Sequence, residues 1–476
     1  MKKSSTKFLF TATLSALIGV GVGLGISGTD TGRMIKERKA EVVGGLADQF
    51  IASQSKHDPN LKVKTVNGLH SIPVNVDQFQ NNIFRASGVA NTFLVKTSEG
   101  NVLFDTGLAT QAAKHKRLLQ EAAGGDIAYI VLSHSHGDHV GGLRYWQAEY
   151  PDAKIIVHER FSEGQRYLKD LEPYFWDRNR TLYTFMPEQP PEDDSMFAYG
   201  GINGDIVVED GSSYEFELGG VQFQIIPTPG AEGDDNLVMW IPEQKALFTG
   251  DVFGPLFPMV PNLFTLRGER FRNPVAYIDS LDTMVELKPE MILPSHFDPL
   301  TDAEQLQSDL AKMREATRYI HDATIAGMNA GKTLWQLMDE VRLPDEINLS
   351  QGHGKISWNV RSIWEYYSTW FHFESTTELY SVPVRQLYPE LAGLIGGAEP
   401  LMAKAEEQVS NNQPVKALHY IEMVLAGEPG YEAAYELRLQ ALNQLLKHAY
   451  ENGSNFSETG WLKSRIAATE KDIAAL

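Results

Sequence analysis

Residues 131–142 read VLSHSHGDHVGG, which places three histidines and an aspartate within six residues, at His134, His136, Asp138 and His139. The whole chain has only 13 histidines. Neutral imidazoles together with a carboxylate are ligands that suit zinc, and also manganese or iron. Four ligands this close in sequence crowd a single tetrahedral ion but fit two ions side by side. The motif therefore predicts a two-metal site.

A two-metal site needs further ligands, including a carboxylate that bridges both ions. Three candidates follow later apolar runs: Glu232 in PTPGAEGDDN, Asp251 in LFTGDVF and His296 in ILPSHFDP. Each one alone has an ordinary loop residue as its alternative interpretation. Because each directly follows a predicted strand, all three are expected to lie at the edge of a sheet beside the histidine motif.

The elements that position these residues form an alternating pattern over residues 76–300. NTFLVKT and NVLFDTG flank Glu99-Gly100 and predict a hairpin, and AYIVLS predicts a buried strand that ends at the histidine motif. KIIVH predicts another strand, and we expect His158 at its end to be structural rather than a ligand. VQFQIIP, LVMWI, ALFTG and EMILP continue the series, with helical patterns at 111–123 and 275–287. This alternation predicts a layered α/β domain.

Residues 186–205 are rich in proline, glycine and acids and predict a long loop, either a surface excursion or a lid over the site. From 301 to 476 helical patterns dominate. The last three resemble tetratricopeptide helix pairs but are too few for a solenoid. We therefore expect an all-α second domain that packs against the first or mediates dimerisation.

The N-terminus begins with three lysines, followed by an apolar stretch over residues 8–26. This order is typical of an export signal, although about 19 apolar residues are also just enough to cross a bilayer. We predict that residues 1–30 are a cleaved signal peptide or an uncleaved anchor and that 31–75 are a linker. The remaining chain is then expected outside the cytoplasm, in the periplasm or secreted.

Composition narrows the function further. The formal net charge of -20 disfavours nucleic acid as a partner, because a polyanion would be repelled. The absence of cysteine excludes disulfides, thiolate zinc sites and a cysteine nucleophile. An anionic substrate must therefore be attracted locally, by metal ions or by well-placed arginines.

SHSHGDHVGG with the later TGD and PSH resembles the metallo-β-lactamase superfamily, which implies an αββα sandwich with a dinuclear metal site over residues 76–300. That superfamily usually has a histidine where this chain has Glu232. This substitution, with NLFTLRGE at 262–269 and GKISWNVRSIWEYY at 354–367, resembles the alkyl sulfatase branch. The resemblance implies that residues 301–476 are a helical dimerisation domain.

This resemblance extends over about residues 75–465 and implies a ligand set. The first metal would be held by His134, His136 and Glu232; the second by Asp138, His139 and His296; and Asp251 would bridge both. The family commonly has a glutamate at the bridging position, so the shorter Asp251 is expected to alter metal spacing or preference.

The residues expected to act on the substrate follow from the same resemblance. Asp138, Asp251 and Arg267 are the expected catalytic residues, and Asn262, Arg267 and His353 the expected substrate-binding residues. The planar guanidinium of Arg267 matches an oxyanion in a bidentate manner, although a surface arginine in the run RGERFR is the alternative interpretation. Asp105 is either a partner of a ligand histidine or the cap of the following turn.

Two departures bear on the substrate. Relatives commonly have Tyr-Gly and Ser-His-Asn where this chain has His353-Gly354 and 357–359, so a reshaped pocket is expected. Relatives that act on long-chain detergents usually carry a further sterol-carrier-like domain, which this sequence, ending at Leu476, leaves no room for. A sulfate ester is therefore a firmer expectation than a long alkyl chain.

The sequence thus predicts metal-assisted hydrolysis of a small-molecule sulfate ester to an alcohol and inorganic sulfate, by a homodimer. The expected cofactors are two divalent metal ions, zinc before Mn²⁺ or Fe²⁺. A lactonase, thioesterase or phosphodiesterase on the same fold is one alternative, and a non-catalytic exported metal-binding scaffold is another. The alcohol part, C–O against S–O cleavage and the stereochemistry stay open.

Overall fold

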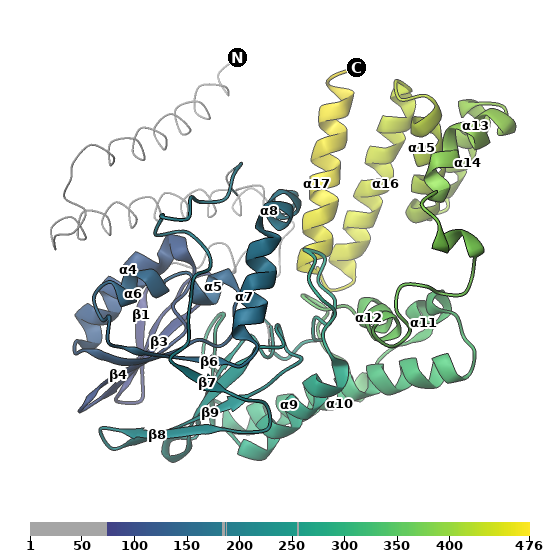
Figure 1. Ribbon diagram of the computed structural model, residues 1–476. Coiled ribbons are helices and arrows are strands. Elements are labelled where there is room, and N and C mark those ends of the chain that lie inside the picture. The colour runs from purple at the N-terminus through teal and green to yellow at the C-terminus, as the bar shows by residue number, and fades with distance from the viewer. Residues whose placement is uncertain (1–73, 183–185, 187, 255–256) are drawn as a thin grey trace, which may run out of the picture.

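The computed structural model describes residues 74–182, 186, 188–254 and 257–476 (Figure 1). The predicted export segment 1–30 lies outside these residues, and the predicted linker 31–75 overlaps them only at 74–75. Among the helices of the described residues, none combines the length and apolar character needed to cross a membrane.

Two β-sheets form the first half of the described chain (Figure 1). One sheet has seven strands in the order β1-β2-β3-β4-β5-β6-β7, and the other has five in the order β12-β11-β10-β9-β8. The strands are β1 (Val76–Phe79), β2 (Ile83–Ala86), β3 (Thr92–Thr97), β4 (Gly100–Phe104), β5 (Ile127–Val131), β6 (Lys154–His158), β7 (Ile206–Val208), β8 (Tyr214–Leu218), β9 (Val221–Pro227), β10 (Leu237–Ile241), β11 (Ala246–Gly250) and β12 (Met291–Pro294). The predicted hairpin is confirmed, because β3 and β4 pair antiparallel.

The two sheets pack face to face through alternate residues of their strands. In β3, Phe93 and Val95 belong to the apolar core between the sheets, whereas Leu94 belongs to the core under the helices on the other face. This alternation follows from the two-residue repeat of a strand. The ring centroids of Phe93 and of Phe248 in β11 lie 5.4 Å apart across the interface.

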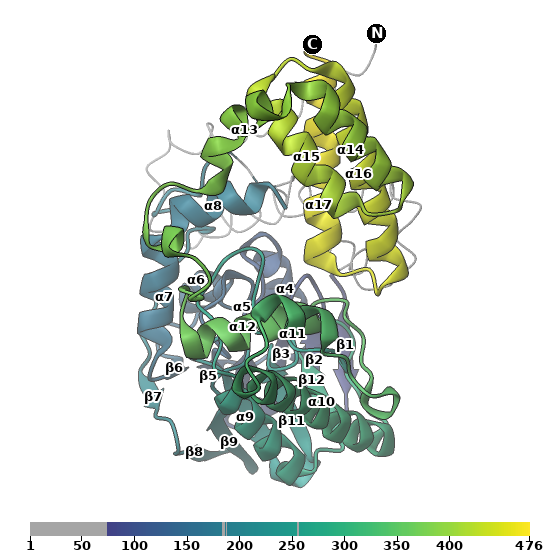
Figure 2. The same cartoon turned by 90° about the vertical axis from the view of Figure 1, so that its right-hand side faces the viewer.

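Helices cover both outer faces. On the seven-stranded sheet, α4 (Ala109–Ala123) and α6 (Leu143–Gln147) contribute Leu119 and Trp146 to the core. On the five-stranded sheet, α9 (Pro274–Leu287) and α10 (Ala303–Asn329) pack through Leu281 and Leu310 (Figure 2). The layers are therefore α, β, β and α, as predicted.

The rest of the chain is helical, as predicted. Its helices are α11 (Leu334–Glu340), α12 (Ile356–Ser368), α13 (Tyr388–Ile395), α14 (Ala398–Ser410), α15 (Pro414–Gly427), α16 (Glu432–Glu451) and α17 (Phe456–Ile473). Val360 and Ile363 of α12 share one apolar core with α9 and α10, so the boundary predicted at residue 300 lies inside that core. A separate core joins α13 to α16, and Figure 2 shows α13–α17 as a distinct bundle above the sandwich.

Some elements were not predicted from the sequence: the strands β1, β2, β7 and β8, and the helices α7 (Phe161–Asp170) and α8 (Glu172–Arg180). The alternation of apolar and acidic residues in YEFEL was a usable signal for β8. Within 186–205 the described residues contain no helix or strand, which agrees with the predicted loop.

Candidate metal centre

The histidine motif lies at the edge of the first sheet. β5 ends at Val131, and the short helix α5 (Gly137–Val140) carries Asp138 and His139. Gly141 and Gly142, which end the motif, both have right-handed helical backbone angles. Gly142 permits close approach of the chain, because a Cβ there would lie 2.1 Å from the carbonyl oxygen of Thr106.

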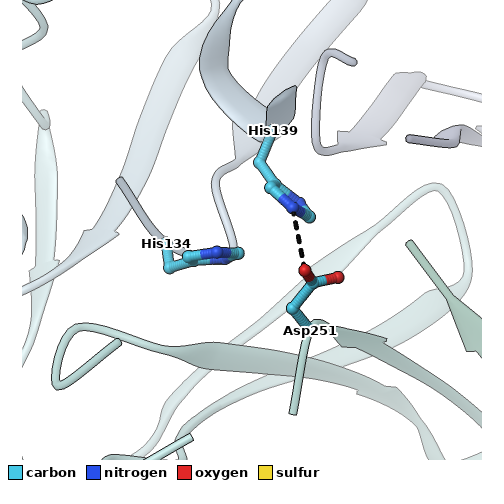
Figure 3. Close-up of side chains that lie close together, drawn as sticks. All are labelled: His134, His139 and Asp251. Carbon is cyan, nitrogen blue, oxygen red and sulfur yellow. Dashed lines mark ion pairs between the residues drawn. The ribbon is translucent and has the colours of Figure 1, made fainter. Parts of the chain in front are cut away.

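Two further predicted ligands reach the motif from the second sheet. β11 and β12 are parallel neighbours, so Asp251 and His296, which follow them, emerge at the same edge. Asp251 Oδ2 lies 3.1 Å from His296 Nε2 and 3.4 Å from His139 Nε2. Figure 3 shows the Asp251 carboxylate pointing toward His139, with the His134 ring beside them.

The remaining side chains of the motif lie close by. Asp138 Oδ2 is 3.5 Å from His296 Nε2 and 3.6 Å from His139 Nε2. His134 Nε2 is 2.8 Å from His136 Nδ1. Six of the seven predicted ligands therefore gather around one space: His134, His136, Asp138, His139, Asp251 and His296.

Each of the four imidazoles is fixed by a partner on its outer nitrogen. His139 Nδ1 donates to Asp105 Oδ2 at 2.8 Å, and His296 Nδ1 donates to the carbonyl oxygen of Val89 at 2.5 Å. His134 Nδ1 lies 3.0 Å from Ser133 Oγ, and His136 Nε2 lies 3.2 Å from Glu269 Oε2. Such outer partners set the tautomer and the direction of metal-binding imidazoles.

Asp105 holds two of these imidazoles in place, His139 directly and His134 through Ser133. Besides His139, its carboxylate accepts the backbone N–H of Ser133 at 2.7 Å and the hydroxyl groups of Ser133 at 2.8 Å and Ser295 at 2.7 Å. Since the Ser133 hydroxyl donates to Asp105, it accepts from His134. Asp105 has a φ of 56°, in the left-handed region that a non-glycine residue rarely adopts. Of its two predicted roles, the histidine partner is the one that the structure shows.

Burial and charge shift the pKa values within this cluster. Burial, with the neighbouring His139 and His136, holds the pKa of His134 well below its usual value. Burial opposes the charged form of His139 too, but Asp251, Asp138 and Asp105 outweigh it and raise that pKa. For Asp251 burial is outweighed by His296 and His139, which hold the pKa of its carboxyl group well below normal.

The donor set fits divalent metal ions. Among the buried polar atoms of the described residues that lack a hydrogen-bond partner are His139 Nε2 and Asp251 Oδ1, both in the space between the ligands. Within this cluster two groups have ligand atoms within 4.8 Å of one another: His134, His139 and Asp251, and Asp138, His139 and His296. The second group equals the set predicted for the second metal. Buried donors without partners in such a cluster are the arrangement expected of a metal site.

Glu232, the seventh predicted ligand, makes different contacts. Arg272 binds its two carboxylate oxygens at 3.0 and 2.7 Å, and Arg267 Nη2 lies 3.4 Å from Oε2. Burial is outweighed by Arg272, His353 and Arg267, so the pKa of Glu232 falls to about 2. Arg267 Nη2 is also 3.4 Å from His136 Nδ1, and thus a positive charge lies between Glu232 and His136. Metal binding by Glu232 stays a prediction.

The predicted substrate-binding residues line the same side. His353 Nε2 lies 3.3 Å from Glu232 Oε1 and 3.1 Å from Asn262 Nδ2, and both His353 and Asn262 are buried. Arg267 is more open, with 26% of its side chain exposed. The structure therefore brings Asn262, Arg267 and His353 together beside Glu232.

Glu269 and Arg272 were missed by the sequence analysis. Glu269 binds Arg267 Nε at 2.8 Å and Arg272 Nη2 at 3.3 Å, and both side chains are nearly buried. Burial of Glu269 is outweighed by Arg267, His136 and Arg272, which hold its pKa well below normal. The run RGERFR predicts an exposed, charged segment, and its single aromatic residue, Phe271, is the only sign in the run that part of it is buried.

A small pocket opens beside His136. Its walls include His136, Tyr167, Asp235, Glu269 and Phe271. It offers an approach from solvent to His136, a predicted ligand of the first metal.

The helical region completes the wall that carries His353. Asn455, the N-cap of α17, donates to the carbonyl oxygens of Gln351 at 2.9 Å and His353 at 2.8 Å. The backbone N–H of Phe456 donates to Gly352 at 2.8 Å. Asn455 is fully buried. We call residues 351–355 the His353 segment.

His158 lies away from the cluster. Its Nε2 donates to Asp210 at 2.8 Å, its Nδ1 accepts the backbone N–H of Arg160 at 3.0 Å, and burial followed by the charge of Arg160 lowers its pKa to about 4. His158, Glu159 and Asp210 also have ligand atoms within 4.8 Å of one another, so the structural role expected of His158 stays a prediction.

Comparison with known proteins extends these observations. Residues 86–296 match the metallo-beta-lactamase superfamily, and residues 333–457 match the alkyl sulfatase dimerisation family. A linear primary-alkylsulfatase from Pseudomonas sp. (strain ATCC 19151) is 26% identical over 331 residues, which cover 66% of this chain and 62% of that protein. An alkyl/aryl-sulfatase from Saccharomyces cerevisiae is 22% identical, over 87% of this chain and 68% of its own.

The solved structures give the fold. A stereoselective inverting sec-alkylsulfatase from Pseudomonas sp. has a TM-score of 0.72 at 20% identity, over 91% of this chain and 70% of that chain. The chain spans 62% and 61% of the lengths of the first two curated relatives. Both family matches lie in the expected order, a metallo-β-lactamase domain followed by an alkyl sulfatase dimerisation domain, and together they support the resemblance to the alkyl sulfatase branch.

Proposed function

We propose that the chain is an alkyl sulfatase, a hydrolase that uses two divalent metal ions, zinc in the first instance, to cleave a sulfate ester into an alcohol and inorganic sulfate. The names of the relatives support the sulfate ester as substrate. One observation carries the proposal: four imidazoles converge on Asp138 and Asp251 beside Arg267. Each imidazole is held by a contact to its outer ring nitrogen.

The proposed roles follow from the contacts. Bound divalent cations would act as Lewis acids on water and on the ester oxygen. Ligand atoms of Asp251, of the predicted first-metal ligand His134 and of the predicted second-metal ligand His139 lie within 4.8 Å of one another, which suits a bridging role for Asp251. Asp138, with 30% of its side chain exposed, is more accessible to solvent than His136, His139, His296 and Asp251.

Arg267 would bind the sulfate group. Its Nε is held by Glu269, while Nη2 points toward His136 at the first-metal side. A guanidinium fixed in this way can offer its N–H groups to sulfate oxygens as negative charge builds on them. In a chain with a formal net charge of -20, this local positive charge explains how an anion would be attracted.

The test is hydrolysis of a panel of substrates by protein stripped with a chelator and then reloaded with Zn²⁺ or Mn²⁺. The panel holds a short and a long primary alkyl sulfate, a secondary alkyl sulfate, and a phosphate ester, a lactone and a thioester. Sulfate release that requires metal supports the proposal, and ¹⁸O-labelled water locates the oxygen in alcohol or sulfate. Turnover of the phosphate ester or thioester alone would replace the sulfatase with another hydrolase.

We further propose that the partner of this chain is a second copy. Eleven of the twenty exposed large hydrophobic side chains of the described residues lie between Tyr366 and Ile395, including Trp370 at 63% and Phe373 at 87%. This apolar segment lies within the match to the dimerisation family. Apolar surface of this extent marks an interaction site. Light scattering should give a dimer that Trp370→Ser together with Phe373→Ser dissociates, and a wild-type monomer would refute it.

A further inference from the structure

Glu269 differs from the other outer partners of the imidazoles. Asp105 and Ser133 belong to one buried network, and Val89 contributes a backbone carbonyl. Glu269 stands apart from that network, on the segment that follows Arg267. Only 11% of its side chain is exposed.

Its two carboxylate oxygens divide their contacts. Oε2 faces His136 Nε2 at 3.2 Å and Arg272 at 3.3 Å, and Oε1 faces Arg267 Nε at 2.8 Å. With its Nε2–H directed at Glu269, His136 turns Nδ1 toward His134 Nε2, 2.8 Å away. One buried carboxylate thus contacts both a predicted ligand of the first metal and the arginine proposed to bind sulfate.

We propose that Glu269 is a positioning residue that directs Nδ1 of His136 at the first metal and ties that ligand to Arg267. The inference rests on the proposed two-metal function, and it goes beyond the ligand set by assigning support of the first metal to a residue outside the histidine motif. It also links the anion-binding arginine to the geometry of that metal.

Loss of Glu269 is expected to affect the first metal site and not the second. Glu269 contacts none of the ligands expected at the second metal among the described residues. Asp105 gives the contrast, because it contacts His139 directly and His134 through Ser133. Loss of Glu269 should therefore weaken one metal site, and loss of the Asp105 charge should weaken both.

The experiment is a titration of chelator-stripped protein with Co²⁺ in the presence of a competing chelator, followed by the visible spectrum of bound Co²⁺. It yields two dissociation constants, and His136→Ala and His296→Ala identify which constant belongs to which site. Glu269→Gln keeps the shape but removes the charge. Removing an outer partner typically costs 10–100-fold in metal affinity, so about 10-fold weaker first-site binding is expected for Gln and about 100-fold for Ala.

Three comparisons decide the outcome. Second-site binding should stay within about 2-fold in both Glu269 variants, whereas Asp105→Asn should weaken both sites. Glu163→Gln is the matched control, because Glu163 also pairs with an arginine of this segment, Arg270 at 2.7 Å, but is half exposed. It should change neither constant. Glu269→Asp keeps the charge at a shorter reach and should give an intermediate loss, which keeps the test available if Gln does not fold.

Equal weakening of both sites by Glu269→Gln, or no weakening, overturns the inference while two-metal binding by the wild type stands. Wild-type protein that binds only one Co²⁺ overturns the proposed two-metal function as well. Neither result depends on turnover of any substrate.

Discussion

Arg272 supports the most demanding prediction, because one buried cation there holds two buried carboxylates. It binds Glu232 at 3.0 and 2.7 Å and Glu269 at 3.3 Å, and only 5% of its side chain is exposed. Arg272→Met replaces the guanidinium with an apolar chain and leaves both glutamates to share Arg267. Breaking a buried pair from one side costs about 3–5 kcal/mol, and we expect this loss in the free energy of unfolding of metal-free protein at pH 7.

The pH dependence gives the prediction its sign. The pKa of Glu232 falls from 4.5 to about 2 in the folded chain, which corresponds to about 3 kcal/mol. A depressed pKa contributes stability above the unfolded value of 4.5 and loses it as the pH falls toward about 2. Without Arg272, burial raises the pKa of Glu232, so the variant gains relative stability as the glutamate takes up its proton. The difference between the two proteins should therefore shrink below pH 5.

The assay is urea unfolding in chelator at pH 7 and pH 4, followed by tryptophan fluorescence. Arg270→Met is the control, since Arg270 pairs with Glu163 at the surface, and an exposed pair is worth less than about 1 kcal/mol. A stability loss for Arg272→Met that is equally large at pH 4 and pH 7 would refute the electrostatic reasoning. A loss for Arg270→Met of the same size would do so as well.

Other substitutions separate the proposed roles. Arg267→Ala should lower kcat/KM for a sulfate ester by about 100-fold or more with two metal ions still bound, as metal analysis of the assayed protein would show. Asp251→Asn should lower both kcat and metal content, because its carboxylate contacts His139 and His296; full metal content would argue against bridging. Gly142→Ala would place a Cβ 2.1 Å from the Thr106 carbonyl oxygen, and thermal unfolding should report about 1–3 kcal/mol of destabilisation.

Much of the sandwich was predictable, because its central strands carry long apolar runs with the two-residue repeat. The runs around Phe93 and Phe248 are examples, and each lies where the sequence predicted a strand. The strands that were missed are short or lie near sheet edges, such as β1 and β7. Segments of three or four residues are too short for a periodicity to be detected, and pairing with a neighbour decides their structure.

The ligand cluster was predictable for a related reason. Asp251 and His296 directly follow buried strands, and the ends of parallel neighbours meet at one edge. The environment of Glu232 was not predictable, because Arg272 belongs to a charged run that local patterns assign to the surface. Its burial depends on two carboxylates, Glu269 from the same run and Glu232 from a loop forty residues earlier in the chain, and the second contact is apparent only in three dimensions.

The hydrogen bonds from Asn455 to the His353 segment limit how this chain can be divided into fragments. A fragment that stops before Asn455 would lose three hydrogen bonds to backbone carbonyl oxygens at the wall that faces Glu232. The side-chain amide of Asn455 donates to Gln351 and His353, and the backbone N–H of Phe456 donates to Gly352. The sandwich freed of its bundle should therefore keep its sheets but not the shape of that wall. Domain-swapped chimaeras of this chain are best cut so that the first turn of α17 travels with residues 351–355.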